Sequence, residues 1–322
     1  MTVANAPRVV GLGALNVDRI FRVERLLADG ESAVEDSGSF AGGSAANTIY
    51  GLARLGIATG FCGAVGDDSN GNLLLADFKK VGTDTSHIAV KSGESSGTVF
   101  CLSSPSKRSL YVLSGANAKL SASDVDMAYV NRADYMHLSS FVDTAQFELS
   151  REVVKKLSPK VKLSFSPGAL YVSRGMEALK PFLARTHILF TNRAEIETLA
   201  GKDFEKAADI CRSAGCEIVV VTLGSGIKIK GWKASSYLRS SNELIWDTPG
   251  AAKINVVDTT GAGDAFATGF LFGMLEGKEL EICVWLGHSA AKLSLKCSGA
   301  RGGLPTRRQL EQYLLTHYGK SL

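Results

Sequence analysis

The sequence has few of the features that place a protein in a class at once. Its six cysteines are scattered, with no C-x-x-C pair and no His or Cys residues at the spacing of metal ligands. This argues against a disulfide framework and a structural zinc site, and it favours reduced, buried thiols. No apolar run approaches the length of a membrane span, so we expect no membrane partner.

The sequence also has no large excess of charge of one sign. The formal net charge of +4 over 322 residues is too mild to indicate nucleic acid or an anionic membrane surface as a partner. Residues 1–8 lack the charged-then-apolar pattern of a signal peptide, and we expect a soluble, cytoplasmic protein. Because no stretch resembles a linker, a repeat or a low-complexity tail, we expect one domain over residues 1–322.

Glycine and other small residues gather in one stretch, Asp258-Thr-Thr-Gly-Ala-Gly-Asp264. The apolar residues 254–257 predict a strand before it, and residues 262–276 predict a helix that Gly277 ends. A helix that begins after a glycine turn presents unpaired N–H groups and the positive end of its dipole to an anion. The backbone groups expected to bind a phosphate are those of Gly261, Ala262 and Gly263.

Asp264 is the one acidic residue just beyond this glycine turn. A carboxylate repels an anion, so its expected role is to take a proton from a hydroxyl that is held beside the phosphate. The plain alternative is a residue that only favours the start of a helix. We favour the first interpretation because of the small residues around it.

The N-terminal part of the chain carries a second polar pattern. Val9–Gly13 is typical of a buried parallel strand. Asn16 and Asp18 lie two residues apart on its expected continuation, so their side chains share one face. The alternative is an Asx turn. Residues 20–40 predict two strands rather than a helix.

Strand and helix signals alternate through the rest of the chain, as in α/β proteins. A polar turn at 103–109 joins two strand-like runs and predicts a hairpin. The expected strands are 98–102, 110–113, 135–138, 161–165, 187–190 and 218–226, and the expected helices are 44–55, 145–157, 175–184 and 280–296.

Three motifs in this order resemble the signatures of the ribokinase-like (PfkB) family of sugar and nucleoside kinases. They are Gly42-Gly43 with Asn47, Asn192-x-x-Glu195, and the stretch 258–264. The resemblance spans nearly the whole chain. It implies an α/β fold with a central, mostly parallel sheet flanked by helices, and a small β-sheet lid formed by about residues 17–41 and 97–115.

The resemblance also implies roles for individual residues. Those that match sugar-binding positions are Asn16, Asp18, Gly42, Gly43 and Asn47. Those that match nucleotide-binding positions are Asn192, Thr222, Gly224 and His288. From the residues alone, a histidine in a helix is more often structural than a ligand, and Asn192 with Glu195 also fits a helix capping box.

Two acidic residues match cation positions of the family. Glu195 matches a position that steers a hydrated Mg²⁺, and Asp258 matches the side-chain ligand of a monovalent cation in many members. The implied cofactors are therefore ATP and Mg²⁺, and a requirement for K⁺ is left open. Dimerisation through the lid is common in relatives and is also left open.

The implied reaction is transfer of the γ-phosphoryl group of Mg-ATP to a primary hydroxyl of a ribose- or fructose-type sugar, with Asp264 as the base. Ser139 falls where ribokinase itself has an acidic sugar contact, which leaves the sugar open. An alternative is a nucleoside kinase, in which the aromatic residues Phe21, Phe100 and Tyr111 stack on a base or simply pack the lid. An alternative of another class is a catalytically inactive sugar- or nucleotide-binding regulator.

Overall fold

The computed structural model describes residues 6–105, 107–229, 232–247 and 255–321. In this part of the chain a nine-stranded sheet has the order β13-β12-β11-β10-β9-β8-β1-β4-β5. Every neighbouring pair from β11 to β5 is parallel, whereas β12 and β13 are antiparallel additions at one edge. The strands are β1 (Val9–Leu12), β4 (Thr59–Gly66), β5 (Ile88–Lys91), β8 (Tyr135–Ser139), β9 (Lys162–Ser166), β10 (Thr186–Asn192), β11 (Ile218–Ile229), β12 (Trp232–Arg239) and β13 (Glu243–Asp247).

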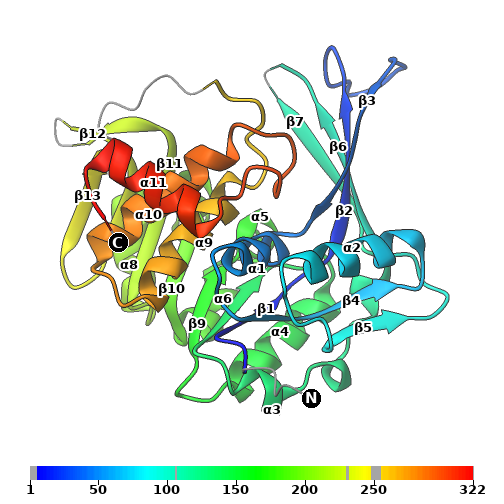
Figure 1. The fold of residues 1–322 in the computed structure, drawn as a ribbon, viewed down its shortest axis with the longest axis horizontal. Coiled ribbons are helices and arrows are strands. Elements are labelled where there is room, and N and C mark those ends of the chain that lie inside the picture. The colour runs from blue at the N-terminus through cyan, green and yellow to red at the C-terminus, as the bar shows by residue number, and fades with distance from the viewer. Residues whose placement is uncertain (1–5, 106, 230–231, 248–254, 322) are drawn as a thin grey trace.

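Helices cover both faces of this sheet (Figure 1). One buried apolar cluster collects residues of α4, α6, α7 and α8, and the other collects residues of α1, α2, α9, α10 and α11. Val9 belongs to one cluster and Val10 to the other, as the alternation of side chains along a strand requires. The helices are α1 (Ser44–Arg54), α2 (Ser69–Lys80), α3 (Met127–Val130), α4 (Thr144–Lys156), α5 (Gly168–Val172), α6 (Met176–Leu183), α7 (Arg193–Ala200), α8 (Phe204–Ser213), α9 (Ala262–Leu275), α10 (Leu280–Ser294) and α11 (Arg307–Tyr318).

A separate four-stranded sheet projects from the α/β body (Figure 1). Its order is β3-β2-β6-β7. The strands are β2 (Asn16–Arg22), β3 (Glu35–Gly42), β6 (Gly97–Ser103) and β7 (Arg108–Leu113). The fold class expected from the sequence is therefore confirmed, with a mostly parallel sheet, flanking helices and a small second sheet.

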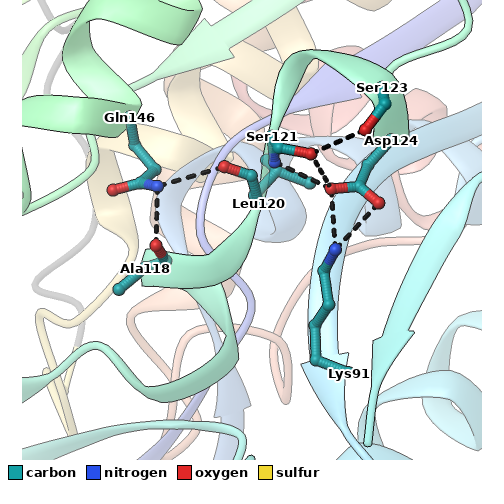
Figure 2. Close-up of polar contacts among 7 residues, drawn as sticks. All are labelled: Lys91, Ala118, Leu120, Ser121, Ser123, Asp124 and Gln146. Carbon is teal, nitrogen blue, oxygen red and sulfur yellow. Dashed lines mark hydrogen bonds and ion pairs between the residues drawn. The ribbon is translucent and has the colours of Figure 1, made fainter.

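The segment that returns from the small sheet to the body is fixed by side chains (Figure 2). It contains the 3₁₀ turns η1 (Gly115–Lys119) and η2 (Ala122–Asp124). Gln146 on α4 donates to the carbonyls of Ala118 and Leu120, and Lys91 at the end of β5 reaches both oxygens of Asp124 at 2.8 Å. The base of the small sheet is thus tied to two elements of the main body.

One predicted strand is wrong. Residue 254 lies outside the described residues, and residues 255–257 form no strand. Val256 and Val257 are 51% and 53% exposed, so they lack the burial of a strand inside the sheet. The N–H of Val257 instead donates to the carbonyl of Leu295, just beyond α10, at 2.8 Å.

Candidate functional site

The glycine turn before α9 has the conformation that an anion site needs. Gly261 has a φ of 73°, and a Cβ there would lie 2.6 Å from the Cβ of Ala300, so packing alone requires glycine. A Cβ on Gly263 would meet no atom within 4 Å. The fold therefore does not require glycine at position 263, and a glycine there leaves its N–H open to close approach.

The backbone N–H groups of this turn are not equivalent. The N–H of Ala262 donates to the carbonyl of Thr259 at 3.3 Å. The N–H groups of Gly261 and Gly263 make no hydrogen bond to any described residue. The turn thus leaves two of the three expected donors free at the positive end of α9.

Asp264, in the first turn of α9, is held by two side chains of α1. Its Oδ1 accepts a hydrogen bond from Ser44 Oγ at 2.7 Å, and its Oδ2 accepts one from Asn47 Nδ2 at 2.8 Å. Burial raises the pKa of Asp264 to about 6, although both hydrogen bonds oppose that shift. The carboxylate is therefore ionised at neutral pH and basic enough to take a proton.

The two glycines before α1 are required by their neighbours. A Cβ on Gly42 would lie 2.3 Å from Asp18 Oδ2. Gly43 has a φ of 98°, and a Cβ there would lie 2.1 Å from the carbonyl oxygen of Ala14. The pair thus allows Asp18 to lie against the turn that begins α1, so two segments that the family resemblance predicts to bind the sugar are in contact.

Asp18 is the second unusual carboxyl group of the site. Burial raises its pKa to about 7; Arg301 opposes this shift, and Asp264 and Asp258 add to it. No described residue donates a hydrogen bond to Asp18. Asn16, by contrast, is only 7% exposed, and its Oδ1 accepts from Asn117 Nδ2 at 3.0 Å.

The sequence analysis missed Ser44 and Arg301. Ser44 directly follows the glycine pair, so its position next to the motif was a usable signal. Arg301 is 7% exposed and contacts Asn47, Gly42 and Asp77. These partners lie more than 220 residues away in sequence, so no local pattern could have found them.

Two of the predicted nucleotide-side residues meet where the parallel pairing of β10 with β11 ends. Asn192 at the end of β10 pairs with Thr222 of β11. Asn192 and Glu195 form the reciprocal capping box of α7, with backbone nitrogen to side-chain oxygen distances of 2.9 and 3.0 Å. Gly224 has a φ of 60°, and a Cβ there would meet no atom within 4 Å. Burial raises the pKa of Glu195, and its bonds with Asn192 oppose the shift.

His288 lies inside the protein. Its Nε2 is 3.0 Å from Ser236 Oγ, and its ring packs edge-on against Phe266 at 5.1 Å between centroids. Burial lowers its pKa to about 3, so the ring is neutral at pH 7. These contacts are those of a structural histidine, and its Nε2 is already within hydrogen-bond distance of Ser236.

Asp258, at the other end of the glycine stretch, has a different environment from Asp264. Its Oδ1 accepts from the N–H of Thr260 at 2.8 Å, and its Oδ2 accepts from the N–H of Gly299 at 2.9 Å. Burial alone would raise its pKa, but these backbone donors hold the pKa below its ordinary value. Within the described ranges, no group of three or more His, Cys, Asp or Glu side chains is arranged to hold a metal ion.

The small sheet turns one face toward this site. Asp18 on β2 pairs with Val99 on β6 and Phe40 on β3. Phe100 and Tyr111 are paired with each other, and Phe100 directly follows Val99, the partner of Asp18. Because side chains alternate along a strand, both rings lie on the face opposite to Asp18. At the near end of β7, Arg108 Nη1 is 3.4 Å from Thr260 Oγ1, which brings this sheet to the glycine turn.

Comparison with known proteins identifies the family of this chain. The pattern of the pfkB family carbohydrate kinases matches residues 6–307. The chain belongs to this family. Family membership makes it a phosphotransferase with an alcohol group as the acceptor. In the described ranges, no helix has both the length and the apolar character needed to cross a membrane.

Individual relatives cover most of the chain. An uncharacterised sugar kinase of Archaeoglobus fulgidus is 35% identical over 79% of this chain and 98% of its own. The ribokinase of Haemophilus influenzae is 29% identical over 94% of this chain and 97% of its own. The solved structure of Arabidopsis thaliana ribokinase complexed with ribose and ATP is 26% identical, covers 96% of this chain and 99% of its own, and has a TM-score of 0.80.

Proposed function

We propose that this protein is an ATP-dependent sugar kinase that phosphorylates a primary hydroxyl of a ribose- or fructose-type sugar. The observation that carries the proposal is the position of Asp264, whose carboxylate is held by Ser44 and Asn47 beside the free N–H groups of Gly261 and Gly263. The names of the relatives support ribose as the first acceptor to test.

The reaction follows from these groups. Asp264 takes the proton of the acceptor hydroxyl, whose oxygen then forms a bond to the γ-phosphorus of ATP while the bond to the β–γ bridging oxygen breaks and ADP leaves. The N–H groups of the glycine turn stabilise the charge on the transferring group. A positioned general base contributes about 10²–10⁴-fold in rate. The sugar is held by a separate set of residues, Asn16, Asp18, Gly42, Gly43 and Asn47.

The cation sites are finer proposals. Glu195 Oε2 accepts the N–H of Asn192, and Oε1 has no partner among the described residues, so Glu195 fits an oxygen that orients a water of hydrated Mg²⁺. When bound, Mg²⁺ neutralises charge on the phosphates. Asp258 has one backbone donor on each oxygen and keeps lone pairs for a monovalent cation; replacing K⁺ by choline in the assay tests this role.

The proposed nucleotide-binding residues are Asn192, Thr222, Gly224 and His288. Asn192 and Thr222 are adjacent where the parallel pairing of β10 with β11 ends, on the side of the sheet where ligands of α/β proteins bind. His288 has its Nε2 engaged by Ser236. Any adenine contact by His288 would therefore come from the rest of its ring.

The small sheet, residues 17–41 and 97–115, is proposed to act as a lid. Asp18 lies on its site-facing side, and Arg108 reaches Thr260 of the glycine turn. Closure over the sugar would exclude water, which otherwise accepts the phosphoryl group.

A second copy of this chain is the proposed partner of the lid. The edge strand β7 exposes four successive apolar residues, Leu110, Val112, Leu113 and Tyr111, by 39–59%. Such an exposed edge is open to pairing. Light scattering of the purified protein tests this partner: a dimer supports it, and a monomer at assay concentration excludes it.

A coupled phosphorylation screen over ribose, fructose, their phosphates and the common nucleosides tests the function. Turnover of ribose or fructose that Asp264→Asn abolishes supports the proposal. Turnover of nucleosides alone replaces it with the nucleoside alternative, which the outward position of Phe100 and Tyr111 does not favour. No turnover of any acceptor in the screen, with intact nucleotide binding, overturns the proposed acceptor class.

A further inference from the structure

We propose that Arg301 is a positioning residue for phosphoryl transfer. Its guanidinium fixes which way the Asn47 amide points and thereby orients the carboxylate of Asp264. The inference rests on the proposed function, because it assumes that Asp264 is the base. It assigns a role to a residue of the last loop, remote in sequence from the helix that it acts on.

The guanidinium of Arg301 joins three elements. Its Nε donates to Asn47 Oδ1 on α1 at 3.0 Å, its Nη2 donates to the carbonyl of Gly42 on β3 at 3.1 Å, and its Nη1 pairs with Asp77 on α2 at 2.7 Å. Only 7% of the residue is exposed. A planar fork that serves three acceptors at once has one orientation.

Two aromatic rings complete this environment. The guanidinium carbon lies 5.1 Å from the ring centre of Tyr50 and 5.0 Å from that of Phe78. Cation–π contacts of this kind strengthen when the cation is removed from water. A buried ion pair is weak evidence for stability, because removing both charges from water costs free energy. The pair of Arg301 with Asp77 therefore calls for a role other than stability.

The consequence for Asn47 follows from its donors and acceptors. An amide has one oxygen, which only accepts, and one NH₂ group, which donates. Since Arg301 Nε–H can only donate, the oxygen of Asn47 must face Arg301. The NH₂ group then faces Asp264 Oδ2, to which it donates at 2.8 Å. A flipped amide would place its oxygen against the carboxylate and leave Arg301 without its acceptor.

The positive charge of Arg301 also favours the ionised form of Asp264 that the base role needs. It opposes the effect of burial on the pKa of both Asp264 and Asp18. The other charged groups that affect Asp264 include Glu195, which raises its pKa, and Asp18 is affected by Asp258 and Asp264. Loss of the positive charge should therefore shift the acid limb of the activity profile to higher pH.

Two variants separate orientation from charge. Arg301→Lys keeps the charge but replaces the fork by a single ammonium, and we expect kcat to fall about 10- to 100-fold, as for a misplaced catalytic group, with the acid limb unmoved. Arg301→Gln loses both, and we expect a larger loss with the acid limb at higher pH. Arg307→Gln is the matched control, because Arg307 pairs with Glu276 and Glu311 outside the site; its kcat and pH profile should stay as in the wild type.

The readouts distinguish positioning from a purely structural role. Each variant is first compared with the wild type by melting temperature and nucleotide binding. If Arg301→Gln does not fold, the cycle of Arg301→Lys with Asn47→Ala decides: losses in kcat that do not add support action through Asn47, and additive losses overturn it. A wild-type kcat in Arg301→Lys also overturns the proposal.

The same set of variants keeps the two proposals apart. If Asp264→Asn loses turnover but Arg301→Lys does not, only the positioning role of Arg301 fails. If Asp264→Asn keeps its turnover, the base role fails and the inference fails with it.

Discussion

Inner strands of the nine-stranded sheet, such as β1, β4 and β8, are buried on both faces, whereas the four-stranded sheet leaves much of its edge strand β7 in water. All eight residues of β4 are buried, but β7 exposes Leu110 by 54% and Tyr111 by 59%. The large sheet and its helices are thus stabilised by contacts within the chain. The small sheet lacks such contacts on β7, which is the property expected of an element that meets a substrate or a second copy.

The same division separates the chemistry. The helix packed on the large sheet supplies Asp264, which is fixed by contacts within the protein. The small sheet supplies Asp18, which has no hydrogen-bond donor among the described residues and a pKa raised by burial to about 7. We infer that the body carries the reacting groups and that the small sheet completes the sugar site.

The largest expected effect is at the base. Asp264→Asn keeps the shape of the side chain but cannot take a proton, so kcat should fall by about 10²–10⁴-fold. Steady-state kinetics measure this, and nucleotide binding and melting temperature serve as controls. Turnover close to that of the wild type would remove Asp264 from the base role.

The two sheets should differ in stability on loss of an aromatic ring. Phe61 on β4 is fully buried and packs against Phe78 at 5.3 Å, so Phe61→Ala should lower the free energy of unfolding by about 3–5 kcal/mol. Tyr111→Ala on β7 is the matched substitution at an exposed site and should change it by about 0.5 kcal/mol or less. Denaturant unfolding measures both, and equal losses would contradict the comparison.

The pH dependence follows from the raised pKa of Asp264. Only the ionised carboxylate takes a proton, so kcat should fall about tenfold per pH unit below the pKa of about 6. The raised pKa of Asp264 affects stability in the opposite sense, since stability falls with rising pH where kcat rises. The folded-state pKa lies above the ordinary value of 3.8, so the folded state binds more protons and stability falls as pH rises through this window.

Both trends can be measured on one pair of proteins. The free energy of unfolding of the wild type relative to Asp264→Asn should decrease between about pH 4 and pH 7. An acid limb of kcat near the ordinary pKa of an aspartate would show that burial does not shift Asp264.

A smaller effect is expected at the tip of the proposed lid. Deleting the turn at 103–109, which includes residue 106 outside the described part, removes Arg108 and its contact with Thr260. We expect a raised KM for the sugar with a stable body, because the turn contributes nothing to the main core. An unchanged KM would mean that this turn is an ordinary edge hairpin.

Much of the fold could be predicted because its signals are local. The strand at 218–226, the helix at 262–276 and the hairpin at 98–113 follow from apolar periodicity and turn residues, and the structure has β11, α9 and the pair β6–β7 there. The strand predicted at 254–257 is wrong for residues 255–257, the part of it that the structure describes. An apolar run forms a strand only where it can pair with a sheet and bury its side chains, and Val256 and Val257 are exposed.

The site was less predictable because its contacts are long-range. The glycine turn and Asp264 could be found from their spacing. The support of Asp264 by Ser44 joins residues 220 positions apart, and the contact of Arg301 with Asn47 joins residues 254 apart. The capping box of Asn192 and Glu195 could be derived locally, whereas its proximity to Thr222 needed the pairing of β10 with β11.

The most direct test of the account is a crystal structure with Mg²⁺, a non-hydrolysable ATP analogue and the sugar that is turned over. The account predicts that the terminal phosphate accepts hydrogen bonds from the N–H groups of Gly261 and Gly263, with the acceptor hydroxyl within hydrogen-bond distance of Asp264. A terminal phosphate bound away from residues 261–264 would contradict it.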